Sequence, residues 1–83
     1  MPYIEQAKRN RLGRTILPYD SGELNYTITI LIQKYLQQFG DLSYNNINEV
    51  IGVLECVKLE LYRRIAAPYE DLKMEDNGDV FTL

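Results

Sequence analysis

The fold is decided by residues 47–65, which read INEVIGVLECVKLELYRRI. Apolar side chains recur there at three- and four-residue intervals, close to a heptad spacing, which is the period of one α-helix face. They are Ile47, Val50, Ile51, Leu54, Val57, Leu61 and Ile65. Glu55 precedes Lys58 by three positions and Glu60 precedes Arg64 by four, and both spacings allow helix-stabilising ion pairs. The stretch predicts a long amphipathic helix.

The ends of this helix are predicted from capping residues and from proline. Ser43 or Asn45 can cap its N-terminus. Pro68 disfavours the α conformation of the residue before it, so we expect the helix to run from about residue 46 to residue 66.

A second helix is predicted over residues 21–39. Asp20 and Glu23 have the spacing of a capping box, and Gly40 is placed to end the helix. Its apolar positions are Leu24, Ile28, Leu31, Ile32, Tyr35, Leu36 and Phe39. Several β-branched residues lie in the same stretch and favour a strand locally, but strands rarely run this long.

We therefore expect a single all-α domain built as an antiparallel hairpin of two long helices. The hairpin spans residues 21–67, a short N-terminal helix or arm precedes it in residues 1–20 (with 3–12 helical), and residues 68–83 form an acidic tail. Apolar residues also lie outside the two stripes, namely Ile30, Val53 and Leu59. Two helices cannot cover that surface, so we expect a dimer or tetramer assembled as a helical bundle.

Composition excludes several classes of protein. The 83 residues include one cysteine and no histidine, so an intrachain disulfide is impossible and the commonest zinc ligand and general base are absent. We expect Cys56 to be buried and inert, and the protein to be a cytoplasmic non-enzyme without metal or cofactor. No apolar run is long enough for a membrane span, and a net charge of −3 argues against bulk DNA or RNA binding.

Tyrosine is the one unusual feature of the composition, with seven tyrosines and no tryptophan. Tyr35 and Tyr62 fall on the helical stripes, where we expect them in the core. Four more lie near helix ends, namely Tyr3, Tyr19, Tyr26 and Tyr69. An aromatic ring beside an arginine can hold a base and its phosphate. Sealing a subunit interface explains these tyrosines equally well. The candidate ligand-binding residues are Tyr3, Arg9, Asn25, Tyr26, Lys58, Arg63 and Tyr69.

Several segments also resemble a known family. They are MPYI at residues 1–4, GELNYTIT at 22–29, NEVIGVLE at 48–55, YRR at 62–64, PYED at 68–71 and NGDV at 77–80. The chain resembles a family of short uncharacterised proteins, a domain of unknown function found in bacteriophages, prophages and bacteria. The resemblance covers nearly the whole chain and is weakest over residues 13–20. It implies no established activity.

The phage setting implies a class of task, because small phage proteins often bind and disable a host component. We expect a homo-oligomer that sequesters a nucleotide-like anion without cleaving it, as the viral sponges of cyclic-nucleotide immune signals do. The alternative is a protein-interaction module that binds and inhibits a host or phage protein through its helical face. An enzyme is the third possibility, which the absence of a base, nucleophile or metal set disfavours.

Overall fold

The structure is a computed structural model that describes residues 3–7, 10 and 17–83. Over these residues it is helical, without a strand. Helix α2 spans Ser21–Gln37, helix α3 spans Tyr44–Leu61, a π-helical turn η1 spans Tyr62–Ala66, and helix α4 spans Ala67–Asn77. None of the described helices is long and apolar enough to cross a membrane.

The start of α2 is formed as its sequence predicts. The carboxylate of Asp20 accepts a hydrogen bond of 2.8 Å from the backbone N–H of Glu23, which satisfies one of the free donors of the first turn. The helix ends at Gln37, two residues before the predicted end. Gly40 follows with φ of 78°, a left-handed conformation that glycine adopts without steric cost.

Helix α3 also begins as predicted. Ser43, rather than Asn45, is the cap, and its hydroxyl accepts from the N–H of Asn46 at 3.1 Å. Downstream, the predicted stop at Pro68 is wrong, because the helical path continues through η1 into α4. The N–H of Ala67 bonds to the carbonyl of Tyr62, five residues back. This wider turn and the position of Pro68 at the start of α4 accommodate a residue that has no N–H to donate.

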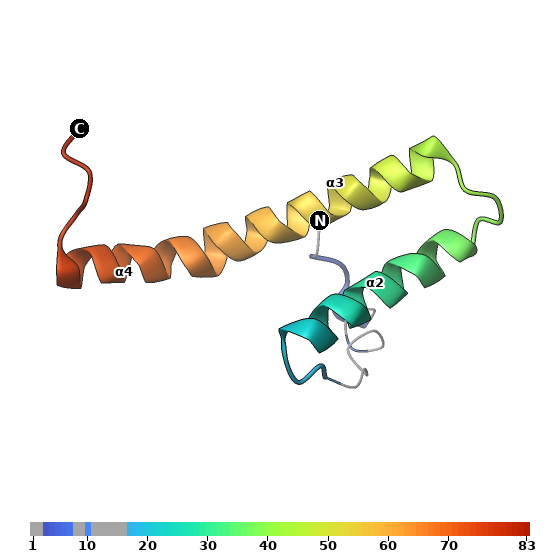
Figure 1. Cartoon of the computed structure of the whole chain (residues 1–83), viewed down its shortest axis with the longest axis horizontal. Helices are drawn as coiled ribbons and strands as arrows, with labels where there is room; N and C mark the ends of the chain where they lie inside the picture. Colours follow the sequence, from blue (N-terminus) through green and yellow to red (C-terminus); the bar gives the residue numbers. More distant parts are fainter. Residues whose placement is uncertain (1–2, 8–9, 11–16) are drawn as a thin grey trace.

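Together, α3, η1 and α4 form one nearly straight rod over residues 44–77 (Figure 1). At about 1.5 Å per residue the rod is ~51 Å long, in line with the longest dimension of the molecule, 52 Å. The N–H of Gly78 bonds to the carbonyl of Met74 and ends the rod, with a φ of 89° at the glycine. Much of the predicted acidic tail is therefore helix.

Helices α2 and α3 meet near their connecting turn and diverge away from it, so that they form an open angle (Figure 1). The radius of gyration is 17.3 Å, whereas a compact domain of this length has one of about 12 Å. The helical class is confirmed, but the single chain is extended.

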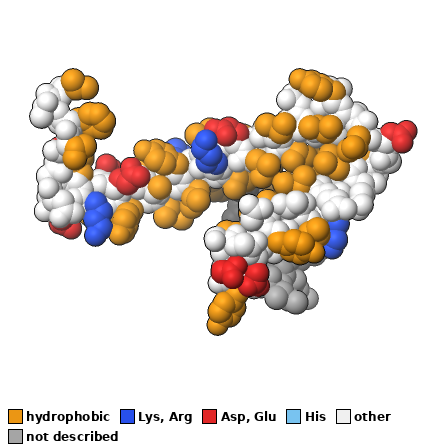
Figure 2. Space-filling view, in the orientation of Figure 1, with side chains coloured by type: hydrophobic (Ala, Val, Ile, Leu, Met, Phe, Trp, Pro, Cys, Tyr) orange, Lys and Arg blue, Asp and Glu red, His pale blue; other side chains and the backbone are white. Residues whose placement is uncertain are grey.

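No described residue is buried, and the structure therefore corrects three predictions about the core. Cys56 is exposed, and so are Tyr35 and Tyr62. All three lie on helices as predicted, but a single chain supplies no second layer to cover them. Figure 2 shows hydrophobic side chains gathered over the angle between α2 and α3 and spaced along the rod.

The predicted helix over residues 3–12 lies partly outside the described residues. Gln6, Ala7 and Asn10 are helical, and the side-chain amide of Gln6 donates to Asn10 Oδ1 at 2.9 Å.

Candidate functional site

Two of the predicted site residues meet on one carboxylate. The hydroxyl of Tyr3 donates to Glu60 Oε2 at 2.6 Å, although the two residues are 57 positions apart. Arg63 Nη2 forms an ion pair with Glu60 Oε1 at 3.0 Å, one helical turn further on. We call Tyr3, Glu60 and Arg63 the Glu60 cluster. Glu60 pairs here with Arg63 and not with Arg64, the partner predicted by the i, i+4 spacing.

The electrostatics of the Glu60 cluster follow from these contacts. The hydrogen bond from Tyr3, followed by that from Arg63, holds the pKa of the Glu60 carboxyl below its ordinary value of 4.5. The same carboxylate raises the pKa of Arg63. Only Nη2 of Arg63 contacts Glu60, and the Arg63 side chain is 64% exposed. Tyr3 also interacts with Arg63, and the exposed part of the guanidinium faces solvent, where it can meet an anion.

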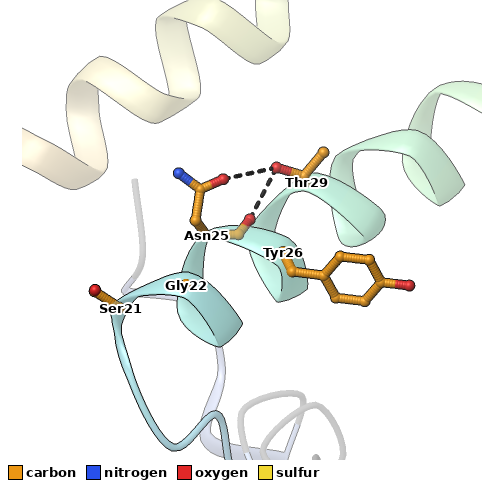
Figure 3. Close-up of a pocket in the computed structure, with 5 residues that line it drawn as sticks. All are labelled: Ser21, Gly22, Asn25, Tyr26 and Thr29. Carbon is orange, nitrogen blue, oxygen red and sulfur yellow. Dashed lines mark hydrogen bonds between the residues drawn. The ribbon is translucent and has the colours of Figure 1, made fainter.

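A second pair of predicted residues, Asn25 and Tyr26, lines a shallow hollow at the start of α2 together with Ser21, Gly22 and Thr29. The Thr29 hydroxyl donates to the backbone carbonyl of Asn25 at 2.8 Å and lies 3.2 Å from Asn25 Oδ1 (Figure 3). The Tyr26 ring points away from Asn25 and is 67% exposed. This exposed face is available for stacking.

The remaining predicted residues lie apart from these groups. Lys58 pairs with Glu55 at 3.3 Å, as the three-residue spacing predicts. Tyr69 lies on α4, and the ammonium of Lys73 sits 5.6 Å from its ring centroid. Arg9 lies outside the described residues. Within one chain the predicted set therefore divides into separate groups and does not form a single pocket.

Sequence reasoning missed an apolar groove of about 360 Å³ between α2 and α3. Among the described residues that line it, Glu49 alone is charged. The other lining residues are Ile28, Leu31, Ile32, Tyr35, Val50, Val53, Leu54 and Val57. The apolar position of Val53, outside the main stripe, was the signal in the sequence. The angle between the helices could not be derived from periodicity.

Among the described residues, no group of three or more potential ligands could hold a metal ion. No curated protein and no solved structure matches the chain. A family model described as Domain of unknown function (DUF6899) matches residues 1–80, nearly the full length of the sequence. The chain belongs to this family of unknown function.

Proposed function

We propose that the protein is a non-enzymatic binding protein that works as a homo-oligomer and captures a nucleotide-like anion at its subunit contacts. The Glu60 cluster carries this proposal, because it brings a tyrosine from the start of the chain beside an arginine in the middle of the rod. In a phage or prophage setting, such capture would withdraw an immune signal of the host from its receptor in the host cytoplasm.

The cluster offers three complementary contacts to a nucleotide. The exposed guanidinium of Arg63 suits a phosphate, the Glu60 carboxylate can accept from ribose hydroxyls, and a tyrosine ring can stack on a base. Arg64 follows directly and adds positive charge. Asn25 and Tyr26 supply a second polar and aromatic pair on α2.

Calorimetric titration with a panel of cyclic dinucleotides and ADP-ribose derivatives tests the proposal. We expect one panel member to bind the wild type, and Arg63→Ala to weaken that binding about tenfold or more, since a hydrogen bond to a charged group contributes ~1.5–3 kcal/mol. Lys34→Ala, which removes a cation in the last turn of α2, should bind as the wild type does. Absence of heat and of thermal shift across the panel would refute the proposal, and turnover of a panel member would indicate an enzyme instead.

The apolar groove supports a second candidate, a protein-interaction module that clamps a host or phage protein. Helix-in-groove recognition uses apolar surfaces of this kind. Recovery of one stoichiometric protein partner, lost in Val53→Glu and kept in Arg63→Ala, would favour this candidate.

A further inference from the structure

The rod has two halves of similar length. The first is α3, which forms the angle with α2. The second, residues 62–77, we call the arm; it extends beyond α2 and contacts no other described element besides its neighbours in the rod (Figure 1). The arm carries an apolar stripe at helical spacing, with Ile65, Tyr69 and Leu72 exposed at 64%, 60% and 61%. This stripe continues that of α3 at Leu61.

The whole chain has a surface that a partner would have to cover. Its accessible area is 8039 Å², whereas a compact monomer of 9.7 kDa exposes about 5,100 Å². The excess of about 2,900 Å² per chain is well above the ~800 Å² that each partner buries in a standard interface. A second copy of this chain provides a matching apolar helix.

We propose that the arm of a second copy lies in the groove between α2 and α3 of the first, and that the arm of the first copy lies in the same groove of the second. We call this reciprocal arrangement the exchange. The two rods then run antiparallel about a two-fold axis, with each arm beside the α3 of the other copy. The match in length supports this arrangement, because α3 has 18 residues and the arm joins the 5 of η1 to the 11 of α4. The inference rests on the homo-oligomer of the proposed function but does not depend on its ligand.

Pairing the rods end to end places Leu72 across from Glu49 and beside Val50, and this fixes a register that a cross-link can test.

The register also has a consequence for the Glu60 cluster. The middle of the rod lies between Glu60 and Leu61, so the two-fold axis passes there. Both copies of Tyr3, Glu60 and Arg63 then flank one axis. A ligand bound at the axis would contact both subunits. A single chain could supply only half of these contacts.

An engineered disulfide tests the register directly. In a Cys56→Ser background, Val50→Cys and Leu72→Cys lie about 33 Å apart along one rod at 1.5 Å per residue, whereas a disulfide needs a Cα separation of ~4.4–6.8 Å. A bond between them must therefore join two copies. We expect the double-cysteine variant to run as a covalent dimer under oxidising, denaturing conditions, and each single-cysteine variant to run as a monomer. No cross-linking of the double variant, or equal cross-linking of Val50→Cys alone, would overturn the proposal.

Light scattering of the uncross-linked protein supplies an independent readout. At micromolar concentration Leu72→Glu should have a lower mass in solution than the wild type, because the substitution places a charge in the groove. Leu83→Glu is the matched control, since Leu83 lies beyond α4 and is fully exposed. A monomeric wild type, or equal effects of the two variants, would contradict the exchange. Neither measurement needs a ligand, so the failure of the nucleotide proposal and the failure of the exchange remain distinguishable.

Discussion

The hydroxyl of Tyr3 lies 2.6 Å from the carboxylate of Glu60 and ties the start of the chain to the middle of the rod. Glu60 also holds Arg63, so the carboxylate links two side chains of different chemistry. Since Glu60 is charged in both contacts, protonation should weaken both.

The pKa of Glu60 should therefore be measurable below 4.5, its ordinary value. A group whose folded pKa is depressed contributes stability above its unfolded pKa and loses it as the pH falls through the folded pKa. We expect a carboxyl ¹³C titration of Glu60 to give a midpoint below 4.5, and Tyr3→Phe to raise that midpoint, because the hydrogen bond from Tyr3 is the largest cause of the shift. An unchanged midpoint in Tyr3→Phe would show that the hydrogen bond is absent in solution.

Two glycines should respond oppositely to alanine. Gly40 has φ of 78°, so Gly40→Ala should destabilise the fold by about 1–2 kcal/mol. Gly52 lies inside α3 and a Cβ there meets no atom within 4 Å, so Gly52→Ala should stabilise by about 0.5–1 kcal/mol. Urea unfolding followed by circular dichroism measures both, and a change of the same sign in both variants would contradict the helix boundaries.

The cap of α2 should contribute measurably to stability. Asp20→Ala removes the acceptor for the N–H of Glu23 and should cost about 0.5–2 kcal/mol. Asp20→Asn keeps an acceptor and should retain most of that stability. Thermal unfolding of the two variants compares them, and equal losses would show that charge, rather than the hydrogen bond, matters at this position.

Cys56 should be reactive in the folded protein, contrary to the prediction from sequence. Its side chain is exposed, since a single chain supplies no second layer of helices to cover it. We expect native protein to bind about one equivalent of a thiol reagent, at a rate close to that of denatured protein. Strong protection of Cys56 in the native state would show that another chain covers this face of α3.

Replacing Pro68 by alanine should stabilise the rod. Pro68→Ala restores a backbone N–H to the rod and lets η1 relax towards a regular α-helix, a change worth up to about 3 kcal/mol in a helix interior. We expect a stronger helical dichroism signal and a higher unfolding temperature. A lower unfolding temperature would indicate that the π turn is needed for assembly.

The sequence by itself determined the helical class, the two longer helices and where each of them begins. Asp20, Ser43 and Gly40 are local signals, because a cap or a left-handed residue acts on the backbone within one turn. The Glu55–Lys58 pair could be predicted for the same reason. Pro68 was misread because its effect depends on whether the preceding turn can widen, and no local rule decides that.

Only the tertiary structure decided how the helices lie in space and which residues they bring together. The two facing sides of α2 and α3 line an apolar groove, which the periodicity of each helix alone does not specify. The meeting of Tyr3 with Glu60 spans 57 positions and follows from no spacing rule. Burial was misjudged at Cys56, Tyr35 and Tyr62 for one physical reason: a stripe specifies that a helix face is apolar, whereas covering it requires a second surface.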